Sequence, residues 1–223
     1  MRELVSVHAT TAPDPAVVAR ALGRAGVPPR FQDARLDAFA ARPGTRTAQE
    51  AARAVVTDPK SLLISGQPGT GKTHLVVAAL AARIEAWLVA HPEPDPDPID
   101  AYFGRTRRPW SPPVEPFVVV PTFLDHVRSS MRREVADDPL AELFEPTLVV
   151  LDDLGREKAS EWVVERLYVL LNERYNHCLA TLVTTNFTPE QLVARGYEPH
   201  ISRLAEDGRF VVIEATDYRR RRA

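Results

Sequence analysis

Short apolar runs alternate with helical patterns along most of this chain. Five of these runs have the length and composition of buried strands: residues 61–65, 117–120, 147–152, 180–184 and 210–214. Strands that alternate with helices are typical of a parallel, doubly wound sheet with right-handed crossovers. The pattern therefore predicts an α/β fold, whose ligand lies beyond the carboxyl ends of the strands.

The segments between the runs carry apolar residues at helical spacing. Residues 73–89, after the first run, are apolar on most faces, and the stretches after the second and third runs each present an apolar stripe. Residues 188–191 combine an N-cap threonine, a proline at the first helical position and a glutamine that can cap in return. Residues 47–50 repeat the threonine and the acidic partner of such a box. We expect a helix to begin at each.

Two stretches fall outside this alternation. Residues 1–46 contain one short helical pattern, opened by Asp14 and Pro15, and then a turn-rich passage. This predicts an N-terminal arm ahead of a main domain at 47–223. Residues 91–116 contain proline at too many positions for a helix or a central strand. We expect them to form an extended insertion in the main domain.

Composition limits the classes of function. A chain of 223 residues, 44% of them apolar, is long enough for one α/β domain with a full core. It has no uncharged apolar run of about 18 residues and no signal-type apolar segment after Met1, which favours a cytoplasmic protein with no membrane partner. The single Cys178 cannot form an internal disulfide. With 28 basic and 30 acidic side chains, any contact with nucleic acid must be local.

The strongest chemical signal lies between the first strand and the first helix, where the sequence matches the phosphate-binding pattern G-x-x-x-x-G-K-[ST]. In such a loop the backbone N–H groups surround phosphate oxygens, the lysine reaches the β- and γ-phosphates, and the hydroxyl binds Mg²⁺. The pattern predicts a site for ATP and Mg²⁺. Its residues are Gly66, Gln67, Pro68, Gly69, Thr70, Gly71, Lys72 and Thr73.

Acidic and amide side chains follow two of the other predicted strands. Asp152 and Asp153 end the third run, where Asp152 would hold Mg²⁺ and Asp153 would orient or deprotonate the attacking water. Asn186 follows the fourth run and would hold that water against the γ-phosphate; a role as a turn residue or helix cap is equally open. His74, directly after the loop, is a candidate nucleotide contact, although packing at the helix start is the simpler role.

Six short motifs occur in an order that resembles one family of ATPases. They are residues 26–31 (Gly-Val-Pro-Pro-Arg-Phe), 66–75 (the P-loop), 151–155 (Leu-Asp-Asp-Leu-Gly), 184–186 (Thr-Thr-Asn), 202–204 (Ser-Arg-Leu) and 217–219 (Asp-Tyr-Arg). The sequence resembles the AAA+ ATPases of the DnaC/DnaI helicase-loader group, which includes the IstB transposition helpers. Because many ATPases share the P-loop, the specific part of the likeness lies in the last four motifs.

This resemblance implies a five-stranded P-loop NTPase sheet without a large C-terminal lid. It also implies a homo-oligomer, a ring or spiral with ATP sites at its subunit junctions. By the same resemblance Asn186 is the sensor-1 residue, Arg203 is an arginine finger that enters a neighbour's site, and Arg219 is a sensor-2-like contact to the nucleotide. A guanidinium supplied by a neighbour makes hydrolysis conditional on assembly.

Three basic clusters are candidates for contact with DNA. They lie at residues 105–108 beside Trp110, at 128–133 in the helical pattern after the second strand, and at 219–222. Solvated surface charge is the simpler interpretation of any one cluster. The family resemblance nevertheless implies contact with single-stranded DNA within the ring.

Together these features predict an ATPase, dependent on assembly and DNA, that loads or remodels a replicative DNA helicase. The nearest alternative is a transposition helper that delivers a transposase to target DNA, and a more distant one is a P-loop kinase for a small molecule. The kinase predicts a phosphorylated product, whereas the loader predicts DNA-stimulated release of phosphate. A nucleotide switch without useful turnover also stays open, because Asp153 stands where many AAA+ proteins have glutamate.

Overall fold

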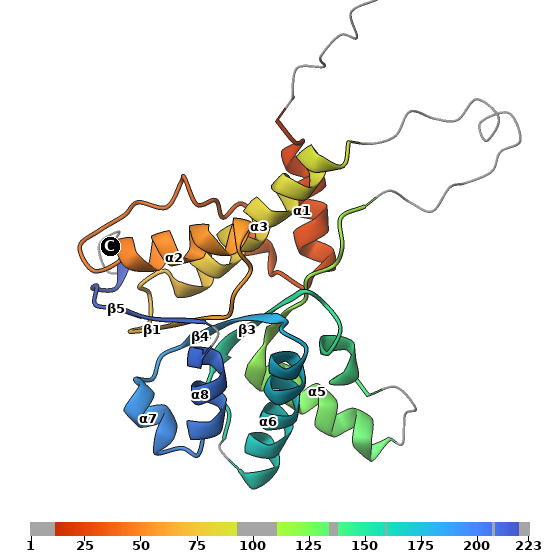
Figure 1. Cartoon of the computed structure of the whole chain (residues 1–223), viewed down its shortest axis with the longest axis vertical. Helices are drawn as coiled ribbons and strands as arrows, with labels where there is room; N and C mark the ends of the chain where they lie inside the picture. The colour runs from red at the N-terminus through yellow and green to blue at the C-terminus, as the bar shows by residue number, and fades with distance from the viewer. Residues whose placement is uncertain (1–11, 93–110, 134–137, 159, 207, 219–223) are drawn as a thin grey trace, which may run out of the picture.

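A single parallel sheet forms the centre of the molecule (Figure 1). The computed structural model describes residues 12–92, 111–133, 138–158, 160–206 and 208–218. All pairings between neighbouring strands are parallel, in the order β2-β3-β4-β1-β5. The five predicted strands and the α/β class are therefore confirmed. The strands are β1 (Leu62–Gly66), β2 (Phe117–Val119), β3 (Leu148–Leu154), β4 (Ala180–Thr185) and β5 (Arg209–Ile213).

Helices cover both faces of the sheet (Figure 1). The first face carries α1 (Pro15–Arg24), α2 (Arg46–Thr57) and α3 (Lys72–Ala90). The second face carries α5 (Val120–Arg132), α6 (Glu161–Asn176), α7 (Pro189–Val193) and α8 (Glu198–Glu206). Short 3₁₀ turns occur at Pro29–Phe31 and Ala141–Leu143.

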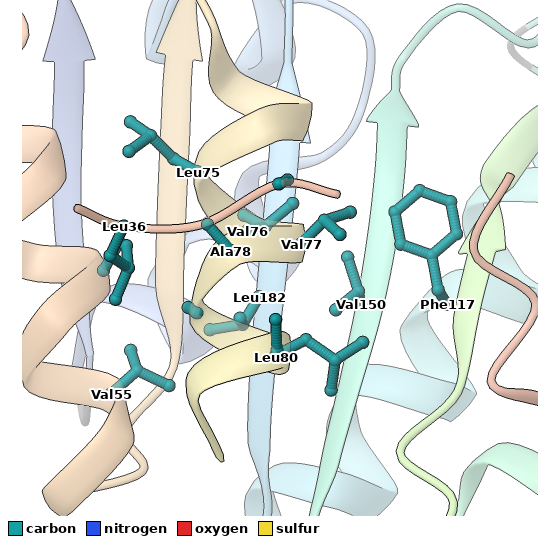
Figure 2. Close-up of a cluster of buried hydrophobic side chains, with 14 of the residues drawn as sticks. Leu36, Val55, Leu75, Val76, Val77, Ala78, Leu80, Phe117, Val150 and Leu182 are labelled. Atoms are coloured by element: carbon teal, nitrogen blue, oxygen red, sulfur yellow. The ribbon is translucent and has the colours of Figure 1, made fainter. Parts of the chain in front are cut away.

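Alternate strand residues pack into two separate cores, because successive side chains of a strand point to opposite faces. Leu62 and Ile64 belong to the core under α1–α3, whereas Leu63 belongs to the core under α5–α8. Figure 2 shows part of the first core, where side chains of α3 meet those of β3 and β4. Among the described helices only α3 is long and apolar enough to cross a membrane, and here it is the central core helix.

Two of the three marked helix starts form as predicted. Asp14 caps α1 by accepting a 2.8 Å hydrogen bond from the N–H of Ala16, and the capping box of Thr188 is complete. The box predicted at residues 47–50 is wrong, because α2 begins at Arg46 after an N-cap at Thr45. The Thr45 hydroxyl is buried and bonds the backbone of Arg42, so the preceding turn fixes the start of the helix.

The N-terminal arm packs closely on the first core. Val18 and Leu22 of α1 are fully buried in that core, and the Ala25 carbonyl accepts a hydrogen bond from the N–H of Phe117. The arm then runs along α2 to the carboxyl edge of the sheet. The domain boundary at 46/47 stays a prediction. Of the proline-rich insertion, residues 91–92 and 111–116 are described, and they contain no helix or strand.

Candidate functional site

The carboxyl ends of β1, β3 and β4 meet because these strands are adjacent in the sheet. The loop after β1 lies beside the carboxylates that end β3 and the amide that follows β4. Together they line a cleft of about 470 Å³. Lys72, Thr73, Asp152, Asp153 and Asn186 all line it, so the structure brings the principal predicted site residues together.

The P-loop takes a conformation that requires glycine at two points. Gly69 has φ 77° and Gly71 has φ 101°, both in the left-handed region that glycine enters freely. A side chain at Gly69 would overlap the Asp217 carboxylate, and one at Gly71 would come within 2.8 Å of the Phe39 ring. Because α3 begins at Lys72, the free N–H groups and positive dipole end of that helix lie at the cleft.

The Lys72 ammonium is held by several oxygens at the base of the loop. It donates hydrogen bonds to the carbonyls of Gly66 (2.8 Å) and Gln67 (3.0 Å) and to the side-chain oxygen of Asn186 (2.7 Å). The lysine is only 5% exposed. A phosphate oxygen that entered the cleft would compete with these neutral acceptors, and an anionic acceptor forms the stronger bond.

Asp152 lies where a divalent cation could be held. Its Oδ1 accepts hydrogen bonds from the hydroxyls of Thr73 (2.9 Å) and Thr184 (2.6 Å). Burial raises the pKa of the Asp152 carboxyl, while the two hydroxyl bonds act in the opposite direction. Mg²⁺ prefers such hard oxygen ligands, so this pair of residues fits it. The described residues hold no cluster of three or more acidic, histidine or cysteine ligands, so most ligands of such an ion would come from phosphate and water.

Asp153 is held by a second set of contacts. Its φ is 61°, an unusual value outside glycine that costs about 1–2 kcal/mol and often marks a functional site. Its N–H donates to the hydroxyl of Thr184 at 3.0 Å. The carboxylate accepts from the Asn186 amide (3.3 Å) and from Arg156 (3.1 Å). Asn186 therefore contacts both Lys72 and Asp153.

Sequence reasoning missed the wall of the cleft that faces these residues. The N-terminal arm supplies part of it and the segment after β5 supplies the rest. The Tyr218 N–H donates to the Gly69 carbonyl at 3.0 Å, and the Arg42 guanidinium lies 5.1 Å from the centre of the Tyr218 ring. Only the motifs at 26–31 and 217–219 pointed to these segments, and of their residues only Arg219 had a predicted role. The cleft residues without a predicted role are Arg30, Phe31, Ala38, Phe39, Ala40, Arg42, Arg156 and Tyr218.

His74 lines the cleft but also packs against the arm. Its ring centroid is 5.5 Å from that of Phe39, and burial lowers its pKa. Its Nε2 is buried and has no hydrogen-bond partner within the described part of the chain. These contacts fit the packing role, and its contact with a nucleotide stays a prediction.

Comparison with known proteins identifies the fold. No family model matches the chain. The DnaC helicase loader matches with a TM-score of 0.65 and 25% identity, over 83% of this chain and 99% of that one. The chain therefore has the fold of the AAA+ P-loop ATPases, and it is similar to the helicase loaders among them.

Other matches to this AAA+ protein agree on the fold. DnaI matches with a TM-score of 0.61 and 19% identity, over 85% of this chain and 93% of that one. A DnaA replication initiator bound to AMPPCP and single-stranded DNA matches with a TM-score of 0.61 and 17% identity, over 85% and 51%. XkdC of the phage-like element PBSX, from Bacillus subtilis (strain 168), is 30% identical over 135 residues. That alignment covers 60% of this chain and 42% of XkdC, so the AAA+ chain spans less than half of this curated relative.

In this AAA+ protein Arg203 lies away from the P-loop. It is on α8 and lines a second cavity, of about 500 Å³, with residues from the amino ends of β1, β4 and β5. Its guanidinium stacks 4.6 Å from the centre of the Tyr168 ring and donates to the Tyr168 hydroxyl (2.8 Å) and the Asn172 side chain (3.0 Å). Arg203 therefore lies at the edge of the sheet opposite the cleft of its own chain. Arg219 lies outside the described residues.

One of the three basic clusters of the AAA+ protein is described. Arg128 and Arg132 on α5 border a shallow cavity with Met131 and Trp162, and the Arg128 guanidinium lies 4.7 Å from the centre of the Trp162 ring. Met131 is 56% exposed. The clusters at 105–108 and 219–222 lie outside the described residues.

Proposed function

We propose that this AAA+ protein binds ATP with Mg²⁺ in the P-loop cleft and uses hydrolysis at subunit junctions to load or remodel a replicative DNA helicase on DNA. The observation that carries the proposal is the meeting of Lys72, Asp152, Asp153 and Asn186 at one edge of the sheet. Support also comes from the fold that the chain shares with the DnaC helicase loader.

In this proposal the two ends of the cleft bind different parts of ATP. The phosphates lie on the N–H groups at the start of α3, with the Lys72 ammonium on the β- and γ-phosphates. Thr73 and Asp152 would hold Mg²⁺, which would neutralise part of the charge of those phosphates. The aromatic side chains of Phe31, Phe39 and Tyr218 then face the base and ribose.

Hydrolysis requires a water molecule in line with the γ-phosphate. Asp153 and Asn186 lie on the side of the cleft next to Lys72, where a carboxylate and an amide can orient that water. In this reaction the Asp153 Oδ2 exchanges its contact with Arg156 for the water, whereas the Asn186 amide keeps its bond to Oδ1. The cleft supplies the base and the positioning groups, but Arg203 of α8 does not line it.

Arg203 supplies the missing charge to a neighbouring subunit. Its place at the opposite edge of the sheet excludes action in its own cleft and suits a head-to-tail assembly, in which one subunit's α8 faces the next subunit's P-loop. A guanidinium at the γ-phosphate stabilises the charge of the transition state, which raises kcat by a factor of about 10³–10⁵. Hydrolysis then depends on assembly.

The proposed partners are a helicase and single-stranded DNA. The DnaC match is named for helicase loading, and one DnaA match was solved with single-stranded DNA. On this chain the Arg128 and Arg132 cluster with Trp162 combines positive charge and an aromatic face, which suits a DNA strand. A cytoplasmic location is part of the same proposal.

The test measures phosphate release from ATP·Mg²⁺ by the purified full chain. Turnover is compared for the protein alone, with an oligo(dT) strand, and with oligo(dT) plus the replicative helicase encoded by the same genome. We expect stimulation by both additions, and Lys72→Ala should abolish ATP binding and turnover. Stimulation by a transposase in place of the helicase would favour the transposition helper, and a phosphorylated small molecule would favour the kinase.

A further inference from the structure

A buried carboxylate that the proposed reaction does not use lies just beyond β3. Glu157 is 9% exposed, and its two oxygens accept the N–H of Gly155 at 2.9 Å and 3.1 Å. The same carboxylate accepts a hydrogen bond from the hydroxyl of Tyr197. No salt bridge to Glu157 occurs in the described ranges. A carboxylate held in this way depends on the geometry of its donors. It therefore fixes the loop that follows Asp153.

Tyr197 joins this carboxylate to the start of α8. Its side chain is fully buried, and its backbone carbonyl accepts the N–H groups of His200 (3.2 Å) and Ile201 (3.0 Å) in the first turn of that helix. Burial, and then the adjacent Glu157, raise the pKa of Tyr197, so its hydroxyl stays a donor. One residue thus connects the loop after β3 to the helix that carries Arg203.

The helices α6 and α8 are packed together as one unit beyond that point. The Nε2–H of His200 donates to the Val164 carbonyl of α6 at 2.9 Å, and the His200 ring contacts the rings of Tyr197 and Tyr168 at centroid distances of 5.2 Å and 6.0 Å. Arg203 stacks on the same Tyr168 ring. A displacement at Tyr197 is therefore passed to Arg203, about 9 Å further along the helix at about 1.5 Å per residue.

We infer that Glu157 and Tyr197 are positioning residues that couple the loop after Asp153 to the arginine finger on α8. The inference rests on the proposed role of Arg203 across a subunit junction. When Asp153 exchanges its contact with Arg156 for water at a γ-phosphate, the following loop shifts. Because Gly155 is hydrogen-bonded to Glu157, and Glu157 to Tyr197 at the start of α8, the shift of the loop moves α8 as well. The nucleotide state of one site thereby sets the position of the finger that this subunit presents to the next.

The test uses two variants that are active only together. Asp153→Asn gives a donor subunit that binds ATP and presents Arg203 but does not hydrolyse, and Arg203→Ala gives a receiver that hydrolyses only with a neighbour's finger. Mixing the two, with oligo(dT) and the helicase present, should restore turnover at the receiver sites. Adding Tyr197→Phe to the donor should then lower the restored kcat by about 10-fold or more, because a small misplacement of a catalytic group costs that much.

Two further measurements separate positioning from loss of structure. The KM for ATP at the receiver sites should stay unchanged. The donor should still bind ATP with its parent affinity and should still assemble with the receiver, as measured by co-sedimentation. Glu157→Gln in the donor removes the charge with little change in volume and should also lower kcat. Glu161→Gln, a matched change at an exposed position in the first turn of α6, should not.

The outcomes distinguish the two proposals. If the parent pair restores turnover and both Tyr197→Phe and Glu157→Gln donors work as well as the parent donor, the coupling is wrong while the proposed function stands. If neither the Asp153→Asn donor nor an otherwise wild-type donor raises turnover at the Arg203→Ala receiver sites, Arg203 does not act across the junction, and the proposed function is overturned together with the coupling. If only the wild-type donor raises it, Arg203 acts across the junction and the finger depends on Asp153, as the coupling requires.

Discussion

Lys72 and Asn186 join the P-loop to strand β4 through a 2.7 Å hydrogen bond from the ammonium to the amide oxygen. The amide nitrogen of Asn186 points the other way and donates to Asp153 at 3.3 Å. One side chain thus contacts both the cation that we propose binds the phosphates and the carboxylate that we propose orients the water. Its oxygen accepts from Lys72 and its nitrogen donates to Asp153, so substitutions at Asn186 can remove both bonds or only the one to Asp153.

Asn186→Ala should lower turnover strongly and ATP affinity weakly. The variant loses a positioned donor near the γ-phosphate, a change that costs about 100-fold in kcat in comparable sites. ATP affinity should change by less than about fivefold, because Lys72 and the backbone N–H groups remain. Steady-state phosphate release and equilibrium binding of a fluorescent ATP analogue measure the two quantities.

Asn186→Asp refines this test. The new carboxylate still accepts from Lys72 but places a second negative charge beside Asp153 and the γ-phosphate, so both kcat and ATP affinity should fall. Asn176→Ala, at an exposed position on α6, is the control and should change neither. Normal turnover in both Asn186 variants would remove this residue from the catalytic site.

The strands and the P-loop could be predicted from sequence because their signals are local. Each of the five short apolar runs has the length and composition of a buried strand, and the glycines of the loop take the backbone conformation that it needs. The sheet order then brings Asp152 and Asn186 together, since all carboxyl ends lie at one edge. The resemblance to helicase loaders added the six-motif order, which supports the same cleft.

The remaining parts of the site depend on contacts that no local pattern records. Phe39 of the arm and Tyr218 near the carboxyl end reach the same cleft only because the arm wraps over α2 and the last strand is β5. The bond between Glu157 and Tyr197 is equally long-range. Thr47 matched a capping pattern, but the buried turn at Thr45 decided where α2 begins.

Gly69→Ala should weaken both folding and ATP binding. Its left-handed backbone costs a non-glycine residue about 1–2 kcal/mol, and the added methyl group would displace Asp217 from the loop. The free alanine variant can relieve this strain by moving the loop out of its binding conformation. If ATP binding must then restore about 1.4 kcal/mol of strain, ATP affinity falls by about tenfold. Urea unfolding and ATP titration measure the two effects.

Gly23→Ala is the matched control for this change. Gly23 lies inside α1 without a positive φ, and the nearest atom to an added methyl group is 3.5 Å away. The control should raise the free energy of unfolding by up to about 1 kcal/mol, since alanine favours a helix interior. Equal ATP affinities for the two variants would show that the Gly69 conformation is not needed for binding.

Arg174→Met should destabilise the fold without a direct change to the P-loop cleft. Arg174 is fully buried and donates to the carbonyls of Leu143, Pro146 and Ala180 and to the Thr181 hydroxyl. Burial lowers its pKa to about 10, so it stays charged at neutral pH. Methionine fills a similar volume but leaves these acceptors unbonded. We expect the free energy of unfolding to fall by about 2–4 kcal/mol.

The urea midpoint of Arg174→Met is compared with that of Arg132→Met. Arg132 is exposed at the end of α5, so the same substitution there should change the free energy of unfolding by less than about 0.5 kcal/mol. Equal midpoints for the two variants would mean that the carbonyls around residue 174 find other donors, and that the buried guanidinium is not needed to join α6 to β4.

The stability of the protein should fall as the pH is lowered below about 6.5, partly because of His200. This side chain is fully buried, its Nδ1 has no hydrogen-bond partner among the described residues, and burial is the main cause that lowers its pKa. Arg203 nearby lowers the pKa further. The folded protein therefore keeps His200 neutral at a pH at which the unfolded chain binds a proton, so acid favours the unfolded chain.

His200→Phe isolates the contribution of His200 to the pH dependence of stability. The phenyl ring keeps the contacts with Tyr168 and Tyr197 but cannot titrate, although it loses the hydrogen bond to Val164 and should be less stable at pH 8. Between pH 6.5 and pH 5.5 the free energy of unfolding of the wild type should fall more steeply, by at most about 1.4 kcal/mol per pH unit for one proton. His74, whose pKa is also lowered by burial, contributes equally to both proteins. Parallel stability curves across this range would mean that His200 takes up its proton without unfolding, and that its burial between α6 and α8 is not maintained in solution.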